Sequence, residues 1–532
     1  MEVPLPVRDA AAPRGANGAE TLLRTLVAGG VDVCFANPGT SEMHFVAALD
    51  RVRAMRCLLG LFEGVVTGAA DGYARMADRP ACTLLHLGPG FANGMANLHN
   101  ASKANSPIVN IVGDHATYHR IYNSPLTSDV EAIARPYSRW LKTSPESAQV
   151  SADAAAAIAA ARRAPGGIAT LVLPANTAWG ESGDVAAVPP VEPPRIPADD
   201  AIEGAARLLE RGAPAALLLG GATLRAGALD VAGQIAARTG ARLYAPYGMA
   251  RAERGAGRVP IRRVPFMLDA ALAMFTELRV LILVGADAPV AFFAYPGRPS
   301  VLTPEGCEVH ALSRADEDGP AALNALADRL GARDAPVPRA EREMLRAATG
   351  AIGLDGLAQT VGAAIRENTI VVDESQTSGR GMMHYSVGAP PHDYICNTGG
   401  SIGYGLPVAV GAAVACPGRR VLCLEADGSG MYTLQSLWTM AREALDVTTV
   451  IFANRKYQVL LGESSNVGAG GVESLGSRAR AMLEIGAPDL DWVQLANGMG
   501  VPGQRVTRLE ALAVALERSF DTPGPALIEV VV

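Results

Sequence analysis

The sequence predicts an α/β protein built from three doubly wound, parallel-sheet domains. Short runs rich in Val, Ile and Leu alternate with Ala-rich helical stretches along the whole chain, and these runs are apolar on both faces. Strands of this kind are typical of parallel sheets that helices cover on both sides. The length of 532 residues points the same way, because it is too great for a single hydrophobic core.

Two proline-bearing segments divide the chain into three blocks. Residues 186–200 hold five prolines and no apolar periodicity, which is typical of an extended linker, and residues 333–343 form a weaker boundary. We therefore expect an N-terminal domain over 14–185, a central domain over 198–332 and a C-terminal domain over 345–532.

Each block contains three or four candidate strands separated by helical patterns. Ligands of parallel sheets bind at the carboxyl ends of the strands, so the loops that follow these runs should hold the functional residues. The candidate strands lie in residues 31–39, 81–90, 106–114 and 168–174 of the first block, 215–221, 279–286 and 307–313 of the second, and 368–375, 419–428, 447–454 and 526–532 of the third.

The composition argues against nucleic acid and membranes as binding partners. A net charge of −7 gives no basic surface for nucleic acid or an anionic membrane, and the longest apolar stretch, from Val280, is interrupted by Asp287 and Pro289. The seven cysteines include no CxxC pair, which argues against a disulfide framework or structural zinc. The opening residues lack a signal peptide. We expect a cytoplasmic protein that acts on small metabolites.

One carboxylate, Glu63, lies in the otherwise apolar stretch LLGLFEGVV. If residues 58–76 form one helix, apolar side chains surround Glu63 on nearly every side. Burying an unpaired ionised carboxylate is costly, so such a group usually becomes protonated or finds a specific partner. A glutamate that reaches water is the alternative, and this segment alone does not decide between them.

A second candidate site follows the strand VLCLEA. Asp427 ends this strand in a Gly-bearing turn, a helix is predicted from about 431 to 444, and the next strand ends at Asn454. Neighbouring parallel strands bring the Asp427 carboxylate and the Asn454 amide oxygen to the same edge of the sheet, and oxygen ligands of this kind suit Mg²⁺. The backbone N–H groups near Gly428 and Ser429 suit a diphosphate. An Asp-Gly pair by itself is more often only a turn.

Here the chain resembles a known family. The stretch Ala426-Asp427-Gly428, followed by Ala453-Asn454, is similar to the thiamine diphosphate motif of the acetolactate synthase and benzoylformate decarboxylase family, GDG and then NN, with Ala replacing the first Gly and the first Asn. Further family motifs occur in the expected order: NPGTSE, FEGVVTGAADGYAR, LGPGFANGMANL, VDESQTSG and GSIGYGLPVAVGAA. The resemblance extends over essentially the whole chain.

The resemblance implies where a cofactor would bind. Glu63 matches the glutamate that hydrogen-bonds N1′ of the aminopyrimidine, Gly400 the backbone carbonyl for the 4′-amino group, and Ile402 the bulky residue that folds the cofactor into a V shape. The diphosphate and Mg²⁺ ends match a further set of residues: Gln376, Thr377, Asp427, Gly428, Ser429, Asn454 and the carbonyl of Lys456.

The family also predicts an oligomer. Its members hold the pyrimidine end of the cofactor on one subunit and the diphosphate on another, so the smallest active species should be a homodimer, with a homotetramer as the alternative. The central block lacks the family's flavin-loop pattern, because residues 245–266 are basic and irregular, and this does not favour bound FAD.

Every family member decarboxylates a 2-oxo acid, and residues near the reacting carbon decide whether an aldehyde or a ligated 2-hydroxyketone leaves. His86 aligns with a catalytic histidine of benzoylformate decarboxylase and Thr40 with a serine that contacts substrate carboxylate, but the second histidine falls on Ala294. The acetolactate synthase Phe-Gln pair is also absent. The expected pocket for an apolar side chain comprises His115, Pro125, Leu126, Val459 and Leu460.

One alternative of another class remains, and a second is excluded. The two Ala replacements in the cofactor motif allow a catalytically silent, cofactor-binding regulatory subunit, although Glu63, Asp427 and Asn454 are all retained. A nicotinamide dehydrogenase would require a third glycine after Gly403 and Gly405 and an acidic residue on the following strand, which this sequence lacks.

Overall fold

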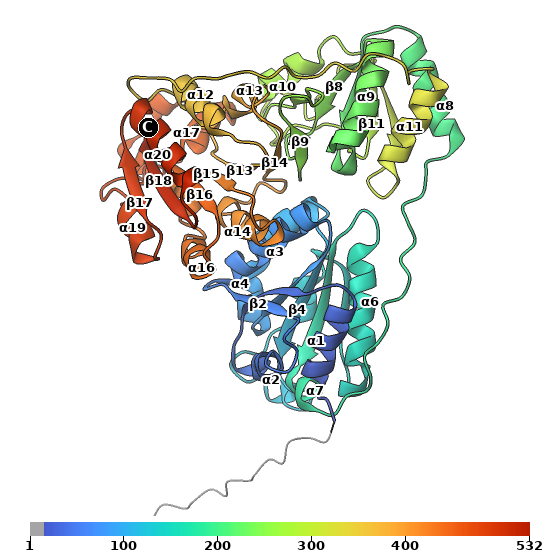
Figure 1. The fold of residues 1–532 in the computed structure, drawn as a ribbon, viewed down its shortest axis with the longest axis vertical. Coiled ribbons are helices and arrows are strands. Elements are labelled where there is room, and N and C mark those ends of the chain that lie inside the picture. Colours follow the sequence, from blue (N-terminus) through green and yellow to red (C-terminus); the bar gives the residue numbers. More distant parts are fainter. Residues whose placement is uncertain (1–14) are drawn as a thin grey trace, which may run out of the picture.

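The structure is a computed structural model that describes residues 15–532. Figure 1 shows three parallel-sheet α/β units, which confirms the predicted fold class. Residue 14, where the first domain was expected to begin, and the opening segment assessed for a signal peptide lie outside the described residues. Among the described helices, none is long and apolar enough to cross a membrane.

The N-terminal unit is a six-stranded parallel sheet in the order β2-β1-β3-β4-β6-β5. Its strands are β1 (Val33–Asn37), β2 (Arg56–Leu59), β3 (Ala81–Leu85), β4 (Ile108–Asp114), β5 (Ser138–Thr143) and β6 (Ile168–Pro174). Its helices are α1 (Gly18–Ala28), α2 (Met43–Ala48), α3 (Glu63–Ala77), α4 (Leu87–Lys103), α5 (Val130–Ala134), α6 (Val150–Arg162) and α7 (Ala175–Trp179).

The central unit is a five-stranded parallel sheet in the order β10-β8-β7-β11-β12. In Figure 1 a long extended segment, which contains the proline-rich residues 186–200, connects it to the N-terminal unit. Its strands are β7 (Ala215–Leu219), β8 (Arg242–Ala245), β10 (Arg262–Arg263), β11 (Val280–Val284) and β12 (Glu308–Ser313), and its helices α8 (Asp199–Glu210), α9 (Ala226–Thr239), α10 (Leu268–Phe275) and α11 (Gly319–Arg329).

The C-terminal unit has seven strands in the order β17-β18-β16-β15-β13-β14-β9, and only β9 is antiparallel to its neighbour. Its strands are β13 (Ile370–Glu374), β14 (His392–Cys396), β15 (Val421–Ala426), β16 (Val447–Ala453), β17 (Gly503–Val506), β18 (Ala526–Val531) and β9 (Ala252–Arg254), the last contributed by the central part of the chain. Its helices are α12 (Leu354–Ala364), α13 (Met382–Tyr385), α14 (Gly405–Ala415), α15 (Asp427–Gly430), α16 (Ser436–Arg442), α17 (Gln458–Asn466), α18 (Ser477–Ala481), α19 (Trp492–Gly498) and α20 (Leu509–Asp521).

Two helix predictions were wrong at their starts. Leu58 belongs to β2 and pairs in register with Phe35 of β1, so the helix that contains Glu63 begins only at that residue. The helix expected from about residue 431 begins only at Ser436, as α16, and the separate single turn α15 precedes it at Asp427–Gly430. In the first case the partner strand that decided the structure is distant in the sequence, where a local apolar pattern cannot reveal it.

Helices α3 and α14 join the N-terminal and C-terminal units through backbone contact. A Cβ added to Gly72 would overlap the carbonyl of Val408, and one added to Gly411 would overlap the carbonyl of Ala69. One hydrophobic cluster continues from the N-terminal sheet through these helices into the C-terminal sheet. Glycine is therefore required where the two helices cross.

We expect Gly411→Ala to lower the free energy of unfolding by about 1–3 kcal/mol, because the added methyl group forces the helices apart. Gly227→Ala is the control: it adds the same methyl group in α9, where nothing lies within 4 Å. That variant should be neutral or slightly stabilising, since alanine favours helix. Denaturant unfolding measures both, and equal stability for Gly411→Ala and wild type would contradict the packing argument.

An ion-pair cluster lies where the three units meet. Asp393 of β14 accepts from the guanidinium groups of Arg251 and Arg419, each at 2.6 Å. Arg251 and Arg225 of the central region both pair with Asp78 at the end of α3, at 3.3 and 2.9 Å. Although burial raises the pKa of Asp393, Arg251 and Arg419 outweigh it and hold that pKa below its usual range.

Asp393→Asn should destabilise the protein by about 2 kcal/mol at neutral pH, because the variant removes the carboxylate that Arg251 and Arg419 share, although Arg251 still pairs with Asp78. A lowered pKa in the folded state gives stability that is present above the unfolded pKa of about 4 and is lost as the pH falls through the folded value. The difference in unfolding free energy between variant and wild type should therefore shrink below about pH 4. Denaturant titrations across this range test it, and a difference independent of pH would contradict the assignment.

Candidate functional site

Glu63 is the first residue of α3 and is 7% exposed. Asn37, at the end of β1, donates to Oε1 at 3.0 Å, and Asn93 of α4 donates to Oε2 at 3.0 Å. A Cβ on Gly90 would lie 3.1 Å from Oε1, so the start of α4 packs closely against the carboxyl group. The buried carboxyl group thus has specific partners and a fixed orientation.

His86, directly before α4, pairs with a second buried acid that sequence reasoning missed. Its Nδ1 lies 2.8 Å from Oε2 of Glu42, which also accepts the N–H of Gly39 at 2.7 Å. Gly39 has no side chain to collide with the imidazole, and Gly113 leaves room for the carboxyl group of Glu42. Burial raises the pKa of Glu42, while His86 and the Gly39 N–H oppose that rise.

This pair fixes the direction of the imidazole. When Nδ1–H donates to Glu42, Nε2 is left to accept or give a proton on the other side of the ring. A histidine oriented by a buried carboxylate is a common arrangement for moving a proton. Glu42 is the last residue of the motif NPGTSE, two positions after Thr40. Its place in this motif is the sequence feature that could have identified it as a site residue.

The candidate metal end lies where β15 and β16 stop. Asp427 is 2% exposed, and its Oδ1 and Oδ2 accept the N–H groups of Gly428 at 2.9 Å and Arg455 at 2.6 Å. Asn454 Oδ1 accepts the N–H of Lys456 at 3.1 Å. Burial raises the pKa of Asp427, while the N–H groups of Arg455 and Gly428 lower it. The two side chains and the 454–456 turn share one edge of the sheet.

The segment from residue 397 to 405 is held by side chains at both ends. Asn397 Oδ1 accepts the N–H groups of Gly399 and Gly400, and Glu374 Oε2 accepts those of Tyr404 and Gly405 at 2.7 Å each. Burial raises the pKa of Glu374 to about 7, against the lowering by these two N–H groups. Gly400 has a φ of +81°, a conformation that favours glycine. Ile402 lies half-buried between the two anchors.

The remaining predicted site residues lie on loops and short helices. Gln376 and Thr377 are half-buried in the loop after β13, and Ser429 and Gly428 are buried in α15. His115 Nε2 lies 3.1 Å from Ser124 Oγ, next to the half-buried Leu126 and the exposed Pro125, while Thr40 is exposed. Val459 and Leu460 lie on α17. Within the described residues, no hydrogen bond links Glu63 or His86 to Asp427 or Asn454.

Comparison with known proteins identifies the family. Residues 16–132 match the N-terminal TPP binding domain of thiamine pyrophosphate enzymes, and residues 375–530 match their C-terminal TPP binding domain. A Mycobacterium tuberculosis protein named "Putative acetolactate synthase large subunit IlvX" is 52% identical over 97% of this chain and 99% of its own length. The chain belongs to the thiamine pyrophosphate enzyme family.

Two further relatives of this chain are named as decarboxylases. Benzoylformate decarboxylase of Pseudomonas aeruginosa is 27% identical over 94% of this chain and 96% of its own length. The thiamine diphosphate-dependent 4-hydroxybenzoylformate decarboxylase of Rhodococcus jostii RHA1 has a TM-score of 0.82 and 25% identity, covering 97% of this chain and 98% of that structure. This thiamine pyrophosphate enzyme is thus related to acetolactate synthases and to benzoylformate decarboxylases.

The residues of this thiamine pyrophosphate enzyme fit its cofactor chemically. A carboxylate from Asp427, an amide oxygen from Asn454 and a backbone carbonyl from Lys456 are hard oxygen donors, the set that Mg²⁺ prefers beside a diphosphate. No cationic side chain forms an ion pair with Asp427 among the described residues. The site could therefore accept a divalent cation without displacing a protein cation.

An aromatic cluster from the central unit lies beside Gly400, and sequence reasoning missed it. The rings of Tyr247, Phe266, Phe292 and Phe293 form a chain of contacts with centroids 5.5, 5.0 and 4.9 Å apart. A Cβ on Gly400 would lie 2.7 Å from Cζ of Phe292. Phe292 and Phe293 are 43% and 48% exposed, so an apolar aromatic wall stands open beside the 397–405 segment.

Proposed function

We propose that this chain uses thiamine diphosphate and Mg²⁺ to decarboxylate a 2-oxo acid with a large apolar side chain, and then releases an aldehyde or ligates a second carbonyl compound. The observation that carries the proposal is the buried Glu63 carboxyl group, oriented by Asn37 and Asn93 at the position where the family binds the aminopyrimidine. The bound cofactor would supply a carbon nucleophile and an electron sink.

The chain's own residues have separable tasks in this proposal. Glu63 would hold a proton at ring nitrogen N1′ of the bound cofactor, and the Gly400 carbonyl would accept a hydrogen bond from the 4′-amino group. Asp427, Asn454 and the Lys456 carbonyl would hold Mg²⁺, and Ile402 would support the cofactor. Gln376, Thr377, Gly428 and Ser429 contact the diphosphate.

His86 handles protons at the substrate. Glu42 orients the imidazole, so Nε2 can deliver a proton to the product or take one from it. Thr40 binds the substrate carboxylate, and His115 adds a polar group to the pocket lined by Pro125, Leu126, Val459 and Leu460. Because two subunits hold the two ends of the cofactor in this family, we expect these residues to meet in a homodimer or homotetramer.

The substrate side chain is the point at which the two candidate reactions differ. The aromatic cluster at Gly400 favours a branched or aromatic 2-oxo acid, as a benzoylformate decarboxylase-like enzyme would use. The 52% identical relative, named as an acetolactate synthase subunit, favours carboligation. A catalytically silent regulatory subunit is the alternative of another class.

A substrate screen distinguishes these candidates. Purified protein with thiamine diphosphate and Mg²⁺ is incubated with pyruvate, with branched 2-oxo acids and with aromatic 2-oxo acids. Each acid is tested with and without an acceptor aldehyde, and the released CO₂ and the organic products are measured. We expect branched or aromatic acids to react at least as fast as pyruvate. Exclusive use of pyruvate to form acetolactate would overturn that preference, and no CO₂ from any acid would support the silent subunit.

Phe292→Ala should raise the KM for an aromatic 2-oxo acid by about tenfold, because it removes one stacking partner worth about 1 kcal/mol plus its buried area. The KM for pyruvate should change little. Phe520→Ala, an aromatic truncation in the distant helix α20, is the control and should alter neither value. A proportional loss with both acids in Phe292→Ala would show that the ring supports the fold and does not select the substrate.

Asp427→Ala should abolish binding of thiamine diphosphate with Mg²⁺ while the fold is kept, because it removes the only carboxylate of the proposed donor set. Calorimetry measures the affinity. Asp446→Ala is the matched control, since this residue lies directly before β16, at the opposite end of the strand. Unchanged cofactor affinity in Asp427→Ala would refute the metal assignment.

Glu63→Gln should retain the fold and much of the cofactor affinity, since an amide can still hydrogen-bond the ring nitrogen. It should slow exchange of the C2 proton of the bound cofactor by at least a hundredfold, a barrier increase of about 2.7 kcal/mol, because an amide cannot pass a proton. Acid-quenched hydrogen-deuterium exchange read by NMR measures this step. Wild-type exchange would identify Glu63 as a structural carboxylate only.

A further inference from the structure

Helix α4 carries a row of asparagines that extends from Glu63 to the turn containing Gly400. Asn93, Asn97 and Asn100 recur at intervals of four and three residues, which is the spacing of one helix face. At one end Asn93 donates to Glu63. In the middle, Asn97 donates to the carbonyl groups of Gly64 at 2.9 Å and Gly403 at 3.2 Å.

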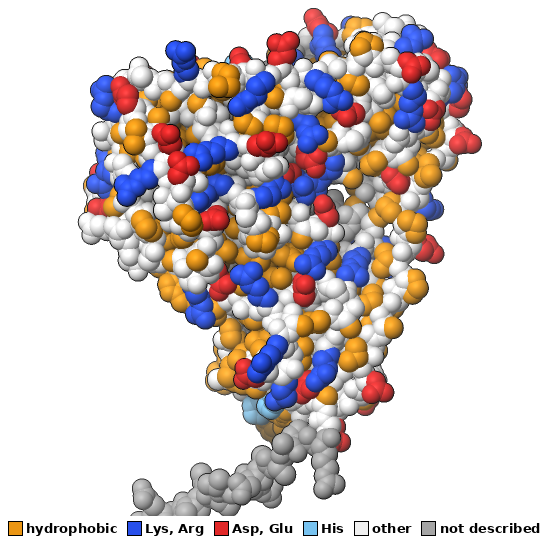
Figure 2. Space-filling view, viewed as in Figure 1, with side chains coloured by type: hydrophobic (Ala, Val, Ile, Leu, Met, Phe, Trp, Pro, Cys, Tyr) orange, Lys and Arg blue, Asp and Glu red, His pale blue; other side chains and the backbone are white. Residues whose placement is uncertain are grey.

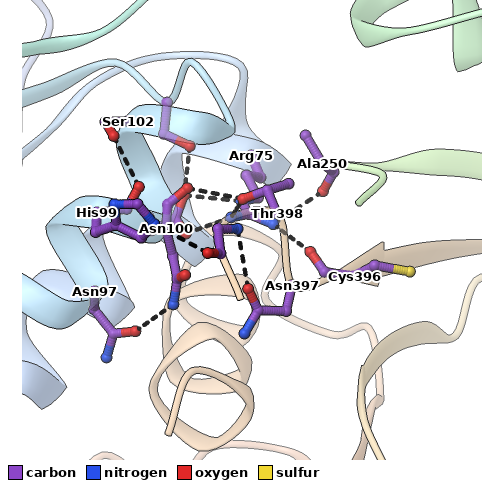
Figure 3. Close-up of polar contacts among 12 residues, drawn as sticks. Arg75, Asn97, His99, Asn100, Ser102, Ala250, Cys396, Asn397 and Thr398 are labelled. Carbon is purple, nitrogen blue, oxygen red and sulfur yellow. Dashed lines mark hydrogen bonds and ion pairs between the residues drawn. The ribbon is translucent and has the colours of Figure 1, made fainter. Parts of the chain in front are cut away.

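Asn100 forms the far end of this row and binds the turn that contains Gly400. Its Nδ2 donates to the carbonyl of Ser401 at 2.9 Å, and its Oδ1 accepts the N–H of the same residue at 3.1 Å (Figure 3). The Thr398 hydroxyl donates to the backbone carbonyl of Asn100 at 2.8 Å. Asn100 is fully buried, so these hydrogen bonds replace contacts with water completely.

Neighbouring side chains of the N-terminal unit hold the rest of the turn. His99 Nε2 donates to the carbonyl of Gly399 at 3.0 Å. Arg75 of α3 donates to the carbonyl of Cys396 at 2.9 Å and to the Thr398 hydroxyl at 3.2 Å. Figure 3 shows these groups converging on the turn from α3 and α4. The C-terminal unit itself supplies Asn397, whose Oδ1 accepts the N–H groups of Gly399 and Gly400 and whose Nδ2 donates to the carbonyl of Ser401 at 2.6 Å.

Gly400 is exposed and adopts a positive φ, and without a side chain it is conformationally free. The orientation of its carbonyl group therefore depends on contacts made by neighbouring residues. The Gly400 carbonyl shares its peptide plane with the N–H of Ser401, which donates to Asn100 Oδ1 at 3.1 Å. A side chain of the N-terminal unit therefore holds the peptide plane that carries a backbone carbonyl of the C-terminal unit.

We propose that Asn100 is a positioning residue that orients the Gly400 carbonyl, and that α4 thereby links the Gly400 turn to Glu63 through one rigid helix. The proposal rests on the proposed function, which assigns the Gly400 carbonyl and Glu63 to the aminopyrimidine. Preorganised hydrogen-bond partners contribute to catalysis only while their geometry is maintained. Loss of Asn100 should consequently act on the cofactor although Asn100 does not touch it.

The test compares full-length Asn100→Ala with wild type and with Asn110→Ala. Asn110 is an equally buried asparagine of β4 that bonds to Thr83 and Thr170, far along the chain from the turn. Three quantities are measured: amide exchange of peptides over 396–404 without cofactor, affinity for thiamine diphosphate with Mg²⁺, and exchange of the C2 proton of the bound cofactor.

Asn100→Ala should speed amide exchange of the turn, and weaken cofactor affinity and slow C2 exchange by about tenfold each, which corresponds to one lost hydrogen-bonded anchor. Asn110→Ala should change global stability only. His99→Phe keeps an aromatic ring but loses the contact with Gly399, and it should show a smaller change in the same direction. If Asn100→Ala does not fold, the same three measurements on His99→Phe test the proposal.

A loosened turn with wild-type affinity and wild-type C2 exchange would overturn the proposal and leave Asn100 a purely structural residue. Equal effects of Asn110→Ala on C2 exchange would overturn it as well, because they would reflect general destabilisation. Failure of the wild-type protein to bind thiamine diphosphate would instead refute the proposed function, and the wild-type arm shows that outcome separately.

Discussion

Helices α3 and α14 cross so closely that the backbone of one touches the backbone of the other, and the candidate site depends on this contact. Gly72 and Gly411 permit the approach, since any side chain there would overlap a carbonyl group. The crossing sets α3, which begins with Glu63, against the helix that begins at the end of the 397–405 segment. A change in the crossing would therefore move Glu63 relative to the 397–405 segment of the same chain.

Polar side chains on buried elements then set the finer geometry. Glu63, His86 and the Gly400 turn each take their orientation from another residue: two asparagines, Glu42, and Asn397 with Asn100. Low local polarity strengthens such contacts and makes an unpaired group costly. Charged side chains of both signs are interspersed over the face seen in Figure 2.

The central unit contributes to the site although its sheet is separate. Its strand β9 extends the C-terminal sheet, its Arg251 joins the ion-pair cluster at Asp393, and its loop after β11 brings Phe292 to Gly400. The basic segment 245–266, which argued against a flavin loop, supplies Arg251, β9 and two rings of the aromatic cluster. This part of the chain thus supports the C-terminal sheet and provides an apolar surface beside Gly400.

The sequence by itself determined the three-domain α/β class, the family and the residues of the cofactor motif, because strand periodicity and short motifs are local properties of the chain. It placed Glu63 in apolar surroundings but extended its helix over residues that pair as β2. Only the tertiary structure decided that Glu42 faces His86, that Asn93 contacts Glu63 while Asn100 contacts the Gly400 turn, and that Phe292 meets Gly400. These contacts join residues as many as 301 positions apart, and a pairing of that kind leaves no signal in the local pattern that surrounds either partner.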